Sequence, residues 1–302
     1  MNYKKYLSTQ HKKTAINLSS RLKSNDFVFF YTCVNEFIGN DKDEFVQAFT
    51  EFGMQFENKY SVQDILQKIF YARAENGIVE FSQTPDAGHF KAILDAYYWL
   101  NLAFVKSYQE EQELKGEFFQ DVVFASLLAY CFYPQALAKT VNYLEAEYKE
   151  SFKAEADRKA PEQRKYDRYY GYGDIFQLLK VLVSDNHKGA FVEMISGTVE
   201  THYEFAIRNF LSEDPGVVNE VLEMLAQFHV NNKGESYLDT LNHDCWKVFP
   251  LEMMGVVICR QRKGLSNAGV SHPLIAAFLP FVFETESLPA DELTRKLELK
   301  II

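Results

Sequence analysis

Apolar residues recur along most of the chain at intervals of three and four, the spacing that places them on one face of an α-helix. The clearest runs are Ile65–Ala72, Ile93–Leu100, Phe118–Ala129, Ile175–Leu182 and Val218–Leu225. Runs that alternate polar and apolar residues between β-branched positions are scarce. The pattern therefore predicts an all-α protein, built as a multi-helix bundle or as an irregular array of helical hairpins.

Turn-forming residues separate these helical runs. Ser61 followed by Asp64 has the pattern of an N-cap with a capping box, so a helix is expected after Ser61. Pro134 follows a very apolar run and is expected to break it, and Pro215 suits the first turn of another helix. Asn76-Gly77 is expected to end a helix.

A charged segment marks the clearest internal boundary, because its residues alternate in sign between positions 145 and 170. We expect an N-terminal helical region over residues 1–150, a charged connector over 151–170 and a C-terminal helical region over 171–302. One continuous domain is the alternative.

Composition supports a packed intracellular protein. Of the 302 residues, 47% are apolar, which is ample for a core, and most of the 26 Phe and 18 Tyr are expected inside it. The four cysteines are dispersed among apolar residues and are expected to be reduced, buried thiols. No apolar segment follows the N-terminal lysines, and the longest apolar run, Leu274–Phe283, is too short to cross a bilayer. We therefore expect a cytoplasmic protein that does not span a membrane.

The distribution of charge favours a protein partner over a nucleic acid. The net charge is −10, and residues 1–23 carry six Lys and Arg and no acid, so the rest of the chain carries −16. An acidic body repels phosphate backbones and speeds the encounter with a basic protein. The same charge is also typical of an ordinary acidic cytosolic protein.

The sequence offers no convincing catalytic or metal site and no cofactor-binding motif. His243-Asp244 invites comparison with metal phosphohydrolases, and His202, His229 and Asp291 could supply further ligands. A dipeptide of this kind is common by chance, and Asp244 is equally suited to cap a helix that begins near Trp246. Cys245 and His243 are two residues apart, so on a helix they point to different faces and form no dyad. We therefore predict a protein that is not an enzyme.

An acidic segment follows the aromatic helix that is expected to end near Tyr108. Free carboxylates of this kind are most often a solvated helix face, and they can also bind a metal or a basic protein. We take the third interpretation as the candidate partner-binding site, made of Glu110, Glu111, Glu113 and Glu117.

The C-terminal third carries a resemblance to a known family. An apolar helix with small residues, Cys245–Val256, leads into an arginine-containing exit, Val257–Leu265, with a glycine at Gly264. An extended segment with His272-Pro273-Leu274 and Leu279-Pro280 follows. This order resembles the helical immunity proteins of bacterial polymorphic toxin systems, most nearly the immunity protein 49 family, over residues 170 to 282.

The resemblance implies a role in bacterial competition without catalysis. Such a protein binds and neutralises a cognate antibacterial toxin in the cytoplasm, and the acidic body suits a basic toxin. The alternative is a helical scaffold or regulator that binds other proteins, because arrays of helical hairpins form grooves for that purpose.

Overall fold

The computed structural model describes residues 2–24, 26–110, 119–147, 178–183, 201–231, 241, 244–284 and 288–302. It is mostly helical, which confirms the predicted all-α class, with one β-hairpin as the exception. The elements in chain order are α1 (Tyr3–Leu22), α2 (Asp26–Asn40), β1 (Glu44–Glu51), β2 (Met54–Ser61), α3 (Val62–Gln83), α4 (Ala87–Gln109), α5 (Phe119–Phe132), α6 (Pro134–Glu147), α10 (Thr201–Asn209), α11 (Pro215–Asn231), α12 (Asp244–Val248), α13 (Leu251–Arg262), α14 (Leu279–Val282) and α15 (Glu292–Ile301).

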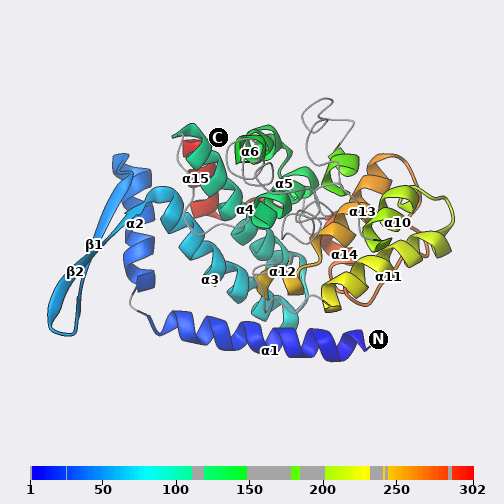
Figure 1. Cartoon of the computed structure of the whole chain (residues 1–302), viewed down its shortest axis with the longest axis horizontal. Helices are drawn as coiled ribbons and strands as arrows, with labels where there is room; N and C mark the ends of the chain where they lie inside the picture. The colour runs from blue at the N-terminus through cyan, green and yellow to red at the C-terminus, as the bar shows by residue number, and fades with distance from the viewer. Residues whose placement is uncertain are drawn as a thin grey trace, which may run out of the picture.

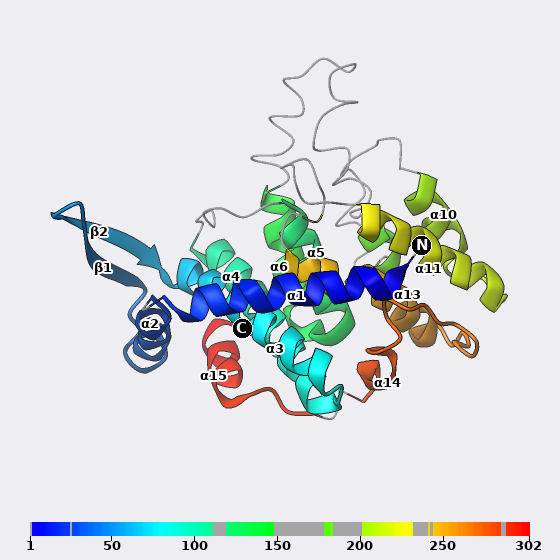
Figure 2. The same ribbon diagram turned by 90° about the horizontal axis from the view of Figure 1, so that it is seen from below.

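Helices α3 and α4 form the centre of the molecule, with α5 and α6 packed beside α4 (Figure 1). Helices α10, α11 and α13 gather at one end, and the hairpin projects from the other end beside α2 (Figure 1). Helix α1 runs along the surface between the two ends (Figure 2). The Tyr3 hydroxyl donates to Glu223 of α11 at 2.6 Å, and Arg21 pairs with Glu75 of α3 at 2.9 Å. These two contacts fix both ends of α1 on the body.

A single hydrophobic core joins residues from both halves of the chain. Trp246 of α12 is fully buried, stacks on Phe124 of α5 at 4.8 Å between centroids, and donates to Asp121 at 2.7 Å. The Tyr97 hydroxyl of α4 donates to the Cys245 carbonyl at 2.7 Å. The described parts of the N-terminal and C-terminal regions are therefore packed on each other, while the expected connector at 151–170 lies outside the described residues.

The turn-forming residues act mostly as the sequence predicts. Ser61 caps α3 with a complete capping box to Asp64. The break at Pro134 separates α5 from α6, and Pro215 is the first residue of α11. Gly264 follows the end of α13 with a φ of +75°, which suits the left-handed position after a helix.

The expectation that Asn76-Gly77 ends a helix is wrong. Helix α3 continues through both residues to Gln83. A Cβ atom at Gly77 would lie 3.1 Å from the Ile93 side chain and 3.2 Å from its backbone nitrogen. The glycine therefore allows α4 to approach α3 closely, and this packing outweighs the low helix propensity of glycine.

The scarcity of strand signals led to a second error. Residues 44–61, which the helical pattern did not cover, form the antiparallel hairpin β1–β2. This hairpin is the only sheet in the described residues.

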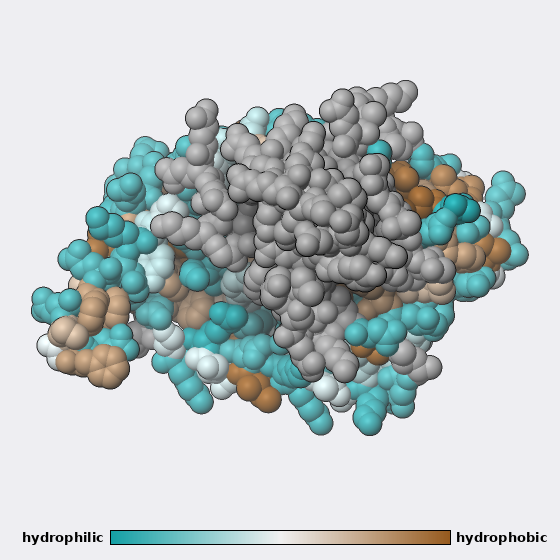
Figure 3. Space-filling model, viewed as in Figure 1, coloured by the Kyte–Doolittle hydropathy of each residue, from teal (hydrophilic) through white to brown (hydrophobic). Residues whose placement is uncertain are grey.

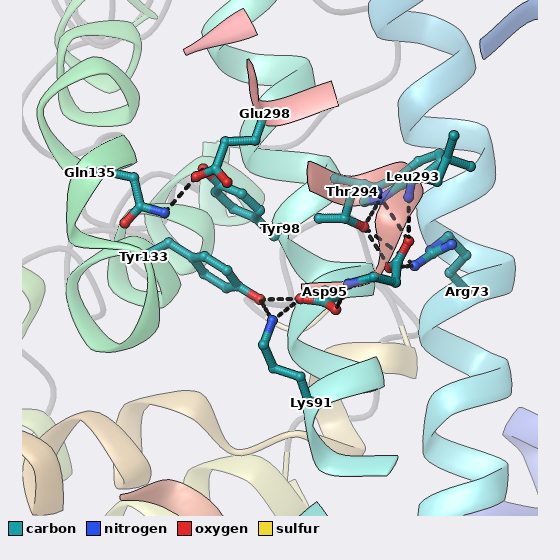
Figure 4. Close-up of polar contacts among 11 residues, drawn as sticks. Arg73, Lys91, Asp95, Tyr98, Tyr133, Gln135, Leu293, Thr294 and Glu298 are labelled. Atoms are coloured by element: carbon teal, nitrogen blue, oxygen red, sulfur yellow. Dashed lines mark hydrogen bonds and ion pairs between the residues drawn. The ribbon is translucent and has the colours of Figure 1, made fainter. Parts of the chain in front are cut away.

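A polar network fixes α15 across α3, α4 and the start of α6 (Figure 4). Asp95 of α4 forms an ion pair with Lys91 and accepts a hydrogen bond from the Tyr133 hydroxyl at 2.9 Å. The Tyr98 hydroxyl donates to Glu298 of α15 at 2.8 Å. Asp95 and Lys91 are both buried, so each depends on this network for its partners.

The N-terminus of α15 is held by the same network. The Asp291 backbone N–H donates to Asp95 at 2.9 Å, and the Asp291 side chain caps the helix and pairs with Arg73. The Trp99 indole donates to Thr294 at 2.7 Å. Asp291 was considered above as a metal ligand together with His243 and Asp244. In the structure, its side chain caps α15.

This cap predicts a pH-dependent stability. Burial would raise the pKa of Asp291, but the Arg73 charge and hydrogen bonds from Thr294 outweigh it and lower the pKa. A lowered pKa contributes stability that is present above the ordinary value, about 3.9, and is lost as the pH falls through the folded-state value.

We expect the free energy of unfolding of an Arg73→Met variant to be lower than that of the wild type near pH 5. The difference between the two proteins should become smaller as the pH falls towards about 2. Urea midpoints measured across this range test it. A gap that stays constant with pH would show that Arg73 acts through packing alone.

Candidate interaction site

The hairpin is closed by a tight turn at Phe52 and Gly53. Both residues have positive φ, 51° and 74°, and Glu51 pairs directly with Met54 on either side. A two-residue loop with two positive φ values is the type I′ turn, whose twist matches that of the strands. The turn fixes the register, and therefore decides which side chains share a face.

The base of the hairpin is part of the core. Phe45 is buried, and the Tyr60 ring lies 5.5 Å from the Phe30 ring of α2 between centroids. Gln47 donates to Asp26 at the start of α2 at 2.8 Å. Because β2 runs directly into α3 at the capped Ser61, the base is fixed from two sides.

The tip of the hairpin exposes large apolar side chains, which we call the tip patch (Phe49, Phe52, Met54 and Phe56). Phe49 and Phe56 stack across the strands at 5.5 Å and are 37% and 38% exposed. Met54 is 57% and Phe52 90% exposed. Residues of apolar hydropathy are coloured tan at the hairpin end of the molecule, at the lower left of Figure 3. Alternate residues of a strand lie on the same face of a sheet. Phe49 and Phe56 therefore lie on the same face of the hairpin as Phe45 and Tyr60, closer to the tip.

The exposed part of the hairpin carries three carboxylates: Glu51 lies next to the tip patch, Glu57 on the opposite face and Glu44 at the base. Glu44, Glu51 and Glu57 are exposed on the two strands, and Lys59 is the only cation there. None of the four forms an ion pair with another described residue of the chain. The projecting part of the hairpin is therefore apolar at its tip and net negative along its length.

Comparison of the chain with protein-family models, with curated proteins and with solved structures found no match. Within the residues that the structure describes, no helix is long and apolar enough to span a membrane.

The predicted acidic site begins close to the base of the hairpin. Glu110 follows α4, and its carboxylate accepts from Lys106 at 2.7 Å and from Gln63 at 3.0 Å. Lys106 also pairs with Asp43, next to β1, at 3.1 Å. Glu110 thus takes part in fixing the hairpin base, while Glu111, Glu113 and Glu117 lie outside the described residues.

The groups considered for catalysis occupy packed settings. All four cysteines are free and buried, as predicted. Burial, with smaller contributions from nearby carboxylates, raises the pKa of Cys245 well above its usual value, so its thiolate is disfavoured. Asp244 begins α12 and pairs with Lys247 at 3.1 Å. His202 has no described side chain and His243 lies outside the described residues.

His229, the remaining residue of the metal hypothesis, is fully buried between α11 and α13. Its Nδ1 lies 2.9 Å from the Glu252 carboxylate, but the two groups do not form a hydrogen bond. No group of three or more His, Cys, Asp or Glu side chains is arranged to hold a metal in the described part of the chain.

The tip patch was missed because aromatic residues were assigned to the core. The sequence did contain a usable signal: Phe45 and Tyr60, and then Phe49 and Phe56, lie symmetrically about Phe52-Gly53. A two-residue turn at Phe52-Gly53 pairs residues whose numbers are symmetric about it, and a glycine in that position is a hairpin signal. No local pattern, however, distinguishes a hairpin face that is buried from one that is exposed.

Proposed function

We propose that this chain is a cytoplasmic immunity protein, which binds and neutralises a cognate antibacterial protein toxin without catalysis. The proposal has two supports of different kinds. The order of elements and turns in the C-terminal third resembles the immunity protein 49 family, and the hairpin presents a surface suited to binding another protein.

The single observation that carries a binding role is the tip patch. Exposed aromatic side chains concentrated on a projecting element are unusual for a monomeric surface and mark sites of protein association. The hairpin base is fixed by Phe45 and by Gln47, so the patch is held in place before the partner arrives. Such preorganisation lowers the entropy cost of binding.

The net negative charge of the hairpin specifies the charge of the partner's surface. The carboxylates of Glu44, Glu51 and Glu57 would repel a second copy of this acidic chain and attract a basic protein. We therefore propose that the toxin presents an apolar pocket edged by Lys or Arg. A toxin that acts on nucleic acid would carry such a surface at its own substrate site.

The direct test is to identify the neighbouring gene in the native host and to co-express its product with this chain. Cells that make the toxin alone should stop growing, and cells that also make this chain should survive. The two proteins should also co-purify as a stable complex. A neighbouring gene that encodes no toxin, together with no co-purifying partner from the native host, would contradict the proposed function.

The acidic segment after α4 supplies a separate prediction. Charge reversal at Glu110, Glu111 and Glu113 should weaken toxin binding and reduce its salt dependence, because negative charge on this chain speeds association with a basic partner. Association rates measured at low and high salt check this. Because Glu110 also binds Lys106, reversal of Glu111 and Glu113 alone is the cleaner variant. Unchanged rates would place the docking surface elsewhere.

A further inference from the structure

A groove of about 440 Å³ lies between α1 and the C-terminal part of α3. Lys4, Ser8 and Lys12 line it from α1, and their spacing of four residues places them in one row along the helix. Half-buried apolar side chains, Leu7 and Val79, line it as well. No Asp or Glu is among the lining residues. The groove therefore combines hydrogen-bond donors and positive charge with apolar surface.

Four lysines of α1 have no ion-pair partner among the described carboxylates. Arg21 is the one residue of α1 that forms an ion pair in the described part of the chain. Lys4, Lys5, Lys12 and Lys13 are exposed and lie beyond ion-pair distance of every described carboxylate. In a chain of net charge −10, this leaves a local positive potential that is available to an external anion.

The shape of the potential favours a short acidic segment over an extended polyanion. Charges are screened beyond about 8 Å at physiological salt, so a ligand confined to the groove meets mainly the lysines. A nucleic acid duplex or an anionic membrane is wider and would also meet the acidic body, which repels it.

The spacing of the two groove lysines gives the pattern of the ligand. Lys4 and Lys12 are eight residues apart, so their Cα atoms are separated by about 12 Å along the helix axis. In an extended peptide, side chains four residues apart lie on one side and are separated by about 13 Å. The residue midway between them points the same way, towards the apolar lining.

We propose that the groove between α1 and α3 binds an extended acidic segment of a partner protein with the pattern Glu-x-Leu-x-Glu. The two carboxylates pair with Lys4 and Lys12, and the leucine contacts Leu7 and Val79. His11 lies between the lysines, and burial lowers its pKa, so its neutral ring offers one N–H donor. This site does not depend on the role of the tip patch.

The test uses a fluorescein-labelled peptide, Ser-Glu-Ser-Leu-Ser-Glu-Ser, titrated with the full chain at low salt and followed by fluorescence anisotropy. The Lys4→Gln, Lys12→Gln double variant should bind roughly tenfold more weakly than the wild type. The matched control is Lys5→Gln with Lys13→Gln, which removes the same charge from α1 outside the groove and should change affinity less than about threefold.

Two further arms separate shape from charge. Ala15→Phe places a large side chain in the groove and keeps every lysine, so it should weaken peptide binding at least as much as the Lys4→Gln, Lys12→Gln double variant. A peptide of the same composition with adjacent glutamates should bind less well. The proposal is overturned if the wild type does not bind the peptide, or if both lysine pairs weaken binding equally. Phosphatidylserine vesicles that bind in place of the peptide, with the same dependence on Lys4 and Lys12, would also overturn it.

Discussion

Replacing Phe52 and Met54 together by serine should weaken toxin binding by roughly 100-fold, the largest effect that we expect from any exposed change. Both side chains project from the hairpin with little contact to their own chain, being 90% and 57% exposed. Their burial would therefore be gained almost entirely on binding. Aromatic and Met anchors that fill a partner's pocket dominate interface energetics in this way.

Two single variants are matched controls for the Phe52→Ser, Met54→Ser double variant. Val46→Ser changes a 52% exposed residue on the opposite face of the hairpin, and Leu299→Ser changes a 77% exposed residue on α15. Both should leave the affinity for the toxin, measured by calorimetry, nearly unchanged. All three variants should unfold at the wild-type urea concentration. If Val46→Ser weakens binding as much as the double variant does, both faces of the hairpin contact the toxin. If the double variant binds the toxin as tightly as the wild type, the tip patch is not part of the interface.

The second large effect concerns stability, and it lies at Asp95. An Asp95→Ala variant should lose about 3–5 kcal/mol of unfolding free energy, because the buried Lys91 ammonium would lose its charged partner. The change also removes the acceptor for the Tyr133 hydroxyl and for the Asp291 backbone N–H. Loss of the last contact should loosen the start of α15, which hydrogen exchange of its amides would detect.

A double variant separates charge from packing at this position. Asp95→Leu combined with Lys91→Met replaces the ion pair by apolar side chains and should recover most of the lost stability. Urea unfolding of the single and double variants supplies the comparison. A double variant as unstable as Asp95→Ala would mean that the hydrogen bonds to Tyr133 and Asp291, and not the charge pair, carry the effect.

The helical part of the fold followed from local physical chemistry. Ser61 and Asp64 satisfy backbone donors of the same helix end, so the capping box can be recognised from residues three apart. Proline restricts its own backbone wherever it occurs, and Pro134 and Pro215 accordingly mark helix starts. Gly77 shows the limit of this reasoning, because its role depends on how closely Ile93 of another helix approaches.

The candidate site could be predicted only in part. The acidic character of the chain is a property of composition, and it is the basis of the proposed binding segment that begins at Glu110. The aromatic tip patch was not predicted. The alternating pattern that places Phe49 and Phe56 on one face is the same whether that face is buried or exposed. Exposure depends on whether another element covers the face.

By itself, the sequence determined the helical class, the capped and proline-marked boundaries and the separation of a basic N-terminal segment from an acidic remainder. These features rest on periodicity, short-range hydrogen bonding and charge, which act within a few residues or need only a count. The tertiary structure alone decided that α2 covers the base of the hairpin and leaves Phe52 uncovered. It also decided that α1 and α3 form a groove at Lys4 and Lys12. Both outcomes arise from contacts between segments distant in the chain, and no local pattern encodes which of those contacts will form.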